Sequence, residues 1–290
     1  MKRKILHISI VCAAAILSAG LLGGCTKRGL SERPSDGPLK IHIKWPDQAD
    51  VAGTQLLLYR SDGTLHANIE CGTEGHECRV PADTYTILAV NSDCSNTQCL
   101  NYESHRTCHL CAESHPTEKG VLQHVHNVYR TAEGGVEVKA GNRPSEVTLY
   151  PQNAVRRLRL DIDPAYVDDI RQMRLRMSGV VPSIRLADGS DTQTETQCIL
   201  ADASAGENGH YTADMSVFGW RGENLVTARL SYTDGREEVS LPQDIGEQLA
   251  ALPQEGGTAH LTLELPSGGE IVLTVTVEAW TRGTGSATVI

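Results

Sequence analysis

Hydrophobic and polar residues alternate along much of the chain after residue 39. The clearest runs are IHIKW at 41–45, LTLEL at 261–265 and IVLTVTVE at 271–278. Successive side chains of a β-strand point to opposite faces, so a period of two indicates a strand with one face buried. The pattern therefore predicts strands along both the early and the late part of the chain.

Turn residues separate many of these extended stretches. Asp-Gly occurs at 62–63, 188–189 and 234–235, and Gly-Gly occurs at 268–269. These pairs tolerate the positive φ angles that tight hairpins require. Helical spacing stands out at 244–252, where DIGEQLAAL places three aliphatic side chains on one face. Many short strands, strong turn signals and little helix predict an all-β protein of the sandwich type.

The segment 140–154, AGNRPSEVTLYPQNA, carries two prolines between extended stretches. Each side of it has enough strands for a small sandwich, and either part is long enough to bury a core. We therefore expect two tandem β-sandwich domains, at 39–150 and 151–290. The first contains a Cys- and His-rich insert at 92–130, which we expect to be a long loop.

The first 24 residues have the features of a secretory signal peptide. Lys2, Arg3 and Lys4 precede an apolar run that ends in Leu-Gly-Gly-Cys. That run is marginal for a transmembrane helix, which needs about 20 apolar residues. The Leu-Gly-Gly-Cys motif resembles the lipobox of bacterial lipoproteins, which implies that Cys25 is lipidated and begins the mature chain. Thr26, rather than Asp, follows the cysteine, which fits the outer membrane, and residues 25–38 read as a flexible tether.

Composition and motifs narrow the classes of function. The chain has 26 Lys and Arg against 36 Asp and Glu, and this acidic balance argues against nucleic acid as a partner. It lacks G-x-S-x-G, H-E-x-x-H and a phosphate-binding Gly-rich loop. Ala112 follows the Cys108–Cys111 pair, so the C-x-x-C-H signature of covalent haem is absent too. We therefore expect a protein that is not an enzyme and has no cofactor besides the lipid on Cys25.

The cysteines are the remaining candidates for chemistry. Exported thiols meet an oxidising environment and tend to pair. The candidates for disulfide bonds are Cys71, Cys78, Cys94, Cys99, Cys108 and Cys111. Cys71 and Cys78 flank a short loop and are expected to pair. The four cysteines of the insert allow three connectivities, of which 94–99 with 108–111 is the local one, and Cys198 is left over.

A zinc site is the alternative for the insert, although no metal is favoured. Its ligands would come from Cys108, Cys111, His105, His109 and His115, which are close enough in sequence to supply four. His124 and His126 share a face if the segment is extended, as a metal pair or as polar surface. Arg174 and Arg176 alternate with apolar residues, which indicates either a solvated strand face paired with nearby acids or a docking patch.

Several landmarks occur in an order that resembles the fimbrillin superfamily of Bacteroidales lipoproteins, closest to FimB-type minor or anchor subunits. After the lipobox cysteine they are IHIKWPD, LYRSDG, VPADTYTILAVNSD, LYPQNAVRRLRLDID, MRLRMSGVVPSIRLADG, LTLELPSGGEIVLTVTVEAW and a terminal ATVI. The resemblance implies two transthyretin-like β-sandwiches and a structural role in fimbriae and cell adhesion. It also implies an outer-membrane location through the lipid, with other fimbrial subunits as partners joined by strand complementation.

Two points of the resemblance stay open. Major subunits of this superfamily lose a leader to an Arg-specific protease, and the candidate sites here are Arg28, Arg33 and Arg60. An anchor subunit would instead keep its lipid, which is the version we favour. The insert at 92–130 departs from the family. The alternatives to a fimbrial role are a surface lipoprotein that binds glycans and a metal-dependent enzyme. The glycan-binding alternative would need exposed aromatic side chains, of which the chain has few, and an exposed Trp220 beside Tyr211 would support it.

Overall fold

The computed structural model describes residues 35–165, 168–206, 209–264 and 271–278. The predicted signal peptide, Cys25, Arg28 and Arg33 lie outside the described residues. No helix in the described part of the chain combines the length and the hydrophobicity that a membrane span requires. Apart from one short helix, the regular elements of the described residues are all β-strands, which confirms the all-β prediction.

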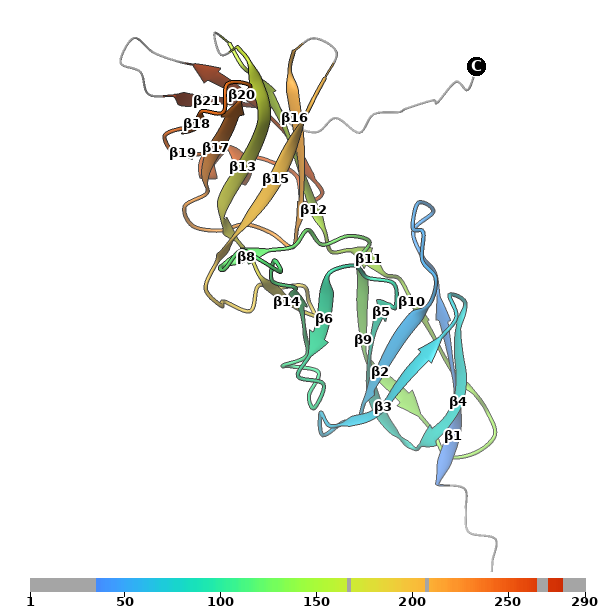
Figure 1. Cartoon of the computed structure of the whole chain (residues 1–290). Coiled ribbons are helices and arrows are strands. Elements are labelled where there is room, and N and C mark those ends of the chain that lie inside the picture. The colour runs from blue at the N-terminus through green and yellow to red at the C-terminus, as the bar shows by residue number, and fades with distance from the viewer. Residues whose placement is uncertain (1–34, 166–167, 207–208, 265–270, 279–290) are drawn as a thin grey trace, which may run out of the picture.

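The N-terminal half is a sandwich of two sheets (Figure 1). The strands of the smaller sheet, in spatial order, are β10 (Ser145–Leu149), β1 (Asp36–Ile43) and β4 (Gly75–Pro81). Those of the larger sheet are β11 (Gln152–Asn153), β9 (Tyr129–Val138), β5 (Asp83–Asn91), β2 (Thr54–Tyr59) and β3 (Leu65–Cys71). Leu39 and Ile41 of β1 meet Leu56, Leu58 and Ile87 of the facing sheet in one core.

The alternation and the turn chemistry explain these strands. In β1, each second residue from Gly37 onward is buried, as the period of two predicted. The Asp62-Gly63 turn joins β2 and β3, which pair antiparallel. Gly63 has φ +84°, and the Asp62 carboxylate accepts hydrogen bonds from the backbone N–H and the hydroxyl of Thr64, at 2.9 and 2.6 Å. The hairpin predicted at 62–63 is confirmed.

The C-terminal half is a second sandwich. Its strands follow one path in the order β18 (Glu237–Val239), β17 (Leu225–Tyr232), β13 (Ile170–Val180), β15 (Gln197–Ala205), β16 (Tyr211–Val217), β12 (Arg156–Asp163), β20 (Gly256–Glu264) and β21 (Val272–Glu278). β15 and β16 pair through only two residue pairs. The path therefore bends there into two layers, whose buried side chains form a common core.

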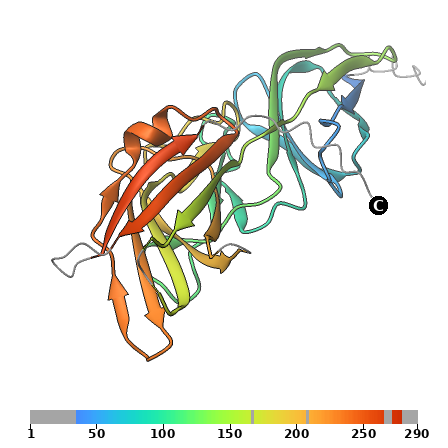
Figure 2. The same cartoon turned by 90° about the horizontal axis from the view of Figure 1, so that it is seen from above.

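Short elements complete this half. β19 (Gln243–Asp244) pairs with β17, and the helix α2 (Gly246–Ala250) follows it. Ile245 and Leu249 are fully buried and Leu252 is 8% exposed, so the helix predicted within 244–252 is confirmed. The blue strands of the N-terminal sandwich and the orange and red strands of the C-terminal sandwich form separate groups in Figure 2.

A third, small sheet lies between the two sandwiches (Figure 1). It consists of β6 (Thr97–Leu100), β7 (His109–Ala112) and β14 (Ser183–Arg185), in the order β14-β7-β6. β8 (Val121–Leu122) runs parallel to β15. β6, β7 and β8 belong to the insert, whereas β14 and β15 belong to the C-terminal half. The insert therefore pairs with strands of the C-terminal half that are distant from it in sequence.

Candidate functional site: the cysteine-rich insert between the sandwiches

The insert at 92–130 is not the long loop that the sequence suggested. Its strand β7 pairs with β6 on one side and with β14 on the other, where Cys111 lies opposite Ser183 and Leu110 opposite Ile184. This pairing joins residues more than 70 positions apart in the chain. The insert therefore adds strands to the junction between the two halves, because β14 offers a free edge that β7 completes.

A separate hydrophobic core forms around this junction. Its buried members come from the N-terminal strands, the insert and the C-terminal half, and they are Leu57, Tyr59, Leu88, Val90, Cys108, Leu110, Val125, Val128, Val155, Val181, Ile184, Leu186 and Phe218. The backbone N–H of Leu186 donates to the carbonyl of Cys108 at 2.9 Å. Nη1 of Arg130 donates to the carbonyls of Leu186 and Ala187, at 3.2 and 3.3 Å. Three parts of the chain thus share one interior.

The seven described cysteines are free thiols in this structure, and they differ in their surroundings. Cys71 on β3 and Cys78 on β4 pack at the border of the N-terminal core, on different sheets, and are not bonded to each other. The Cys94 thiol donates to the carbonyl of Asn91 at 3.0 Å. The disulfide bonds expected from the sequence stay a prediction.

Two thiols of the insert touch. The Sγ atoms of Cys99 and Cys108 are 3.5 Å apart, and Cys108 is fully buried. The contact with Cys108, together with burial, raises the pKa of Cys99, and the hydrogen bond from Cys99 lowers the pKa of Cys108. The nearby Tyr59 hydroxyl is buried without a hydrogen-bond partner in the described residues, and burial raises its pKa.

The predicted zinc ligands do not converge. The His105 ring packs edge-on against Tyr59, with centroids 5.7 Å apart. Nδ1 of His109 is 2.8 Å from the carbonyl of Thr107, so it carries the proton and donates to that oxygen. The sulfur of Cys108 faces Cys99. Within the described residues, no group of three or more His, Cys, Asp or Glu side chains is placed to hold a metal ion.

His124 and His126 stack, with ring centroids 6.1 Å apart and planes 6° from parallel. Nε2 of His124 lies 2.6 Å from the carbonyl of Leu200, and its Nδ1 accepts from the backbone N–H of Ser216 at 3.3 Å. Because a carbonyl oxygen only accepts, Nε2 donates to Leu200, and the two contacts together fix the orientation of the ring. His124 therefore links the insert to two strands of the C-terminal sandwich, a role that the sequence pattern did not reveal.

Arg174 and Arg176 of β13 lie on its outer face, and Arg174 contacts acids. Nε of Arg174 lies 2.7 Å from the Asp202 carboxylate, and its Nη1 lies 3.5 Å from Glu118 of the insert. Nη2 of Arg176 donates to the sulfur of Cys198 at 3.3 Å. The interpretation of a solvated strand face paired with acids fits Arg174. The Glu118 contact is one more link between the insert and the second half.

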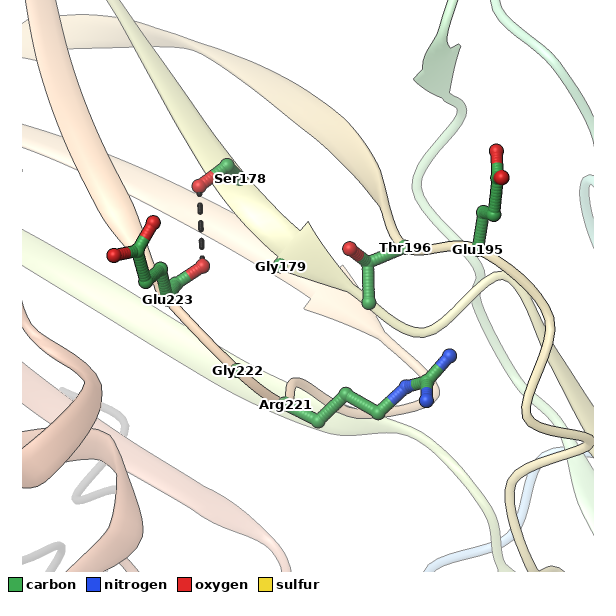
Figure 3. A pocket seen from close by; sticks show the side chains of 7 residues that line it. All are labelled: Ser178, Gly179, Glu195, Thr196, Arg221, Gly222 and Glu223. Carbon is green, nitrogen blue, oxygen red and sulfur yellow. Dashed lines mark hydrogen bonds between the residues drawn. The ribbon is translucent and has the colours of Figure 1, made fainter.

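One hollow, of about 660 Å³, lies in the C-terminal half, where β13 ends and where β15 and β17 begin. Figure 3 shows Ser178 and Glu223 at one end and Arg221, Thr196 and Glu195 toward the other. Arg221 is already engaged, because its Nε lies 2.7 Å from the Asp191 carboxylate. Its guanidinium also contacts the backbone of Thr194. The hollow is open and polar, and its cation is neutralised from within the protein.

The tryptophan that could form a glycan platform is covered. Trp220 is half-buried against the C-terminal core, and the Arg156 guanidinium lies over its ring, 5.1 Å from the centroid. Tyr211 is half-buried as well, and its hydroxyl donates to the carbonyl of Ile170 at 3.2 Å. One face of the Trp220 ring is therefore occupied from within the protein.

Comparison with known proteins gives a match in structure and none in sequence. No family model matches the chain, and no curated protein matches it. A candidate adhesin from Bacteroides ovatus has a TM-score of 0.67 at 15% identity, over 90% of this chain and 99% of that one. The fimbrial anchor protein Mfa2 from Porphyromonas gingivalis has a TM-score of 0.60 at 13% identity, over 85% and 98%. A candidate polysaccharide-binding protein from Bacteroides thetaiotaomicron has a TM-score of 0.58 at 9% identity, over 85% and 98%.

These matches extend over nearly the full length of each relative, so both halves and their arrangement are shared. At such low identity they establish the fold. The resemblance carried by the sequence landmarks is confirmed at that level: the chain has the fold of these Bacteroides and Porphyromonas adhesin and fimbrial proteins.

Proposed function

We propose that this protein is an accessory subunit of a fimbria, of the anchor type, with a structural role in cell adhesion and no enzymatic activity. The observation that carries the proposal is the match to the fimbrial anchor protein Mfa2, which spans 98% of that chain. The match includes both sandwiches rather than one common β-domain. The order of the sequence landmarks from residue 41 onward supports the same assignment.

The attachment to the cell would run through Cys25. A lipid on this residue, reinforced by several acyl chains, would hold the chain at the outer membrane. The first strand, β1, begins at Asp36. Eleven residues of fully extended chain reach at most roughly 40 Å. The N-terminal sandwich would therefore stay close to the membrane surface, with the C-terminal sandwich directed toward the partner.

The partner would be another fimbrial subunit that adds a strand to a sheet edge. β18 ends its layer of the C-terminal sandwich in the described part of the chain. Its Val239 is 56% exposed, and Leu241, just after the strand, is 45% exposed. Exposed aliphatic side chains beside a strand edge favour contact with another chain.

Two observations favour a structural role over the rival functions. A glycan-binding surface built on Trp220 is not favoured, because the Arg156 guanidinium lies over that ring, although Tyr150 is 59% exposed elsewhere on the described chain. A metal-dependent enzyme needs an open coordination site, and the thiols and imidazoles of the insert instead make contacts within the protein. A structural role instead uses the sheet edge at β18 and the exposed aliphatic side chains beside it.

The test is deletion of the gene, followed by complementation. For an anchor we expect cells to shed their fimbriae into the medium, measured by electron microscopy and by immunoblotting of the medium. Full complementation requires Cys25, so Cys25→Ala should restore the protein but not its retention in the outer-membrane fraction. Cys198→Ala, which alters a cysteine of the folded part, is the matched control. Fimbriae of unchanged number, length and attachment after deletion would overturn the proposal.

A further inference from the structure

Cys99 and Cys108 lie at the hydrophobic core of the junction, and their thiols face each other, which packing alone does not require. Cys99 lies on β6, opposite Leu110 of β7, and Cys108 precedes β7 on the same inner face as Leu110. Their sulfur atoms are in contact at 3.5 Å. A disulfide bond is about 2.05 Å long and requires this kind of facing approach. The two sulfur atoms would have to approach each other by about 1.5 Å for the bond to form.

The other cysteines of the insert are directed elsewhere. Cys94 donates its S–H to Asn91, and burial raises the pKa of its thiol to about 11. Cys111 points to the opposite face of β7 from Cys108, and it lies opposite Gln98 and Ser183. Because successive residues of a strand alternate in direction, residues 108 and 111 do not face each other. The 108–111 bond of the local connectivity is therefore at odds with the geometry.

We propose that Cys99 and Cys108 form a disulfide bond in the exported protein, and that this bond closes the β6–β7 hairpin within the core that joins the two sandwiches. Formation requires an oxidant, which we take to be a disulfide-carrying thiol oxidase of the exported compartment. The half-exposed Cys99 gives up its proton and attacks a sulfur of the oxidant, releasing one thiolate. Cys108 then gives up its proton and attacks the sulfur of Cys99, which expels the second thiolate. Two protons and two electrons pass to the oxidant, which leaves as a dithiol.

This bond would act on the junction rather than on one sandwich. Cys108 packs with Tyr59 of the first half, and its carbonyl accepts from Leu186 of the second. The hairpin that the bond closes also carries β7, the strand that pairs with β14. Oxidation would thus fasten the element on which both halves pack, and reduction would loosen it. The proposal rests on export of the chain, which the proposed function includes.

The test is disulfide mapping of the protein isolated from the outer-membrane fraction of its own host. Free thiols are alkylated under denaturing conditions, and the protein is then digested with trypsin without reduction. Trypsin cuts after Arg79, Arg106 and Lys119, so Cys94 and Cys99 fall in one peptide and Cys108 and Cys111 in the next. We expect the two peptides to be joined, with alkyl groups on Cys94 and Cys111. Separate peptides, or alkylated Cys99 and Cys108 in the exported protein, would overturn the proposal.

A second measurement covers the case in which the host supplies little protein. The purified folded chain is equilibrated with oxidised glutathione or with dithiothreitol, and its urea midpoint is measured in each. Reduction should lower the midpoint of the wild-type protein by roughly 1 M, given its loop of about ten residues. The double variant Cys99→Ser/Cys108→Ser should show no such shift, whereas Cys94→Ser/Cys111→Ser should keep it. A shift that follows Cys94 or Cys111 instead would refute the pairing. Protein with the bond but unchanged fimbriae after gene deletion would overturn only the proposed function.

Discussion

Replacement of Leu110 by alanine tests whether the insert joins the two sandwiches. Leu110 is 2% exposed in the junction core, and its backbone pairs with Cys99 on β6 and with Ile184 on β14. The substitution keeps the strand pairing and removes only the buried side chain. Any loss of stability therefore reports on packing between the insert and its neighbours.

The expected loss is about 2–5 kcal/mol, the range for a buried leucine whose cavity is only partly refilled. Collapse around the site is restricted here, because the neighbouring side chains belong to three chain segments that strand pairing already fixes. The upper half of that range is therefore the expectation. Leu100→Ala is the matched control, since Leu100 lies in the same hairpin and is 39% exposed. It should cost no more than about 0.5 kcal/mol.

The assay is urea unfolding followed by tryptophan fluorescence and by circular dichroism. Trp45 reports on the N-terminal sandwich and Trp220 on the C-terminal one. If the junction couples the halves, Leu110→Ala should separate a single transition into two, or lower both together. A loss below about 1 kcal/mol with one unchanged transition would refute the role assigned to the insert, because a buried core leucine cannot be removed so cheaply.

Two other predictions concern the same region. His124→Ala removes hydrogen bonds to two strands of the C-terminal sandwich and should destabilise the protein by about 1–3 kcal/mol in urea unfolding. The control His126→Ala alters an exposed side chain and should change the stability little. Equal effects of the two substitutions would contradict the role of His124 as a link to the C-terminal sandwich. The raised pKa of Cys94, about 11 against an ordinary 9.0, favours its neutral thiol in the folded state. The contribution of this neutral thiol to the free energy of unfolding is therefore complete below pH 9. It is lost as the pH rises to 11, by roughly 2–3 kcal/mol. Unfolding midpoints between pH 8 and 11 should fall less steeply for Cys94→Ala, and an identical slope would exclude this thiol as the cause.

The local structure of this chain follows closely from its sequence. The alternation at residues 41–45 and 261–265 predicts β1 and β20, and the Asp62-Gly63 pair predicts the hairpin between β2 and β3. These features depend on neighbours within a few residues, such as the turn angle that Gly63 adopts. The helix at α2 follows in the same way from the spacing of its aliphatic residues.

The junction could not be predicted in this way, because its partners are far apart in sequence. Nothing near His109–Ala112 specifies that this strand pairs with Ser183–Arg185. The four cysteines of the insert also favoured an interpretation as a metal or disulfide site rather than as part of a packed core. The sequence nevertheless contains a pattern that indicates a buried insert. Val121, Leu122, Val125 and Val128 give the insert a hydrophobic content that a solvated loop does not need, and all four are buried.

The insert restricts how far the two sandwiches can move relative to each other. Two domains joined by one connecting segment ordinarily move relative to each other unless their interface is large and hydrophobic. Here β7 pairs with β14, β8 pairs with β15, and a core of side chains from both halves closes around them. Relative motion would have to break backbone hydrogen bonds and expose that core together. In the proposed anchor role, such a junction would let load pass from a membrane-attached N-terminal end to a partner at the other end without first stretching a hinge. The insert is thus the element that joins and stiffens the two sandwiches.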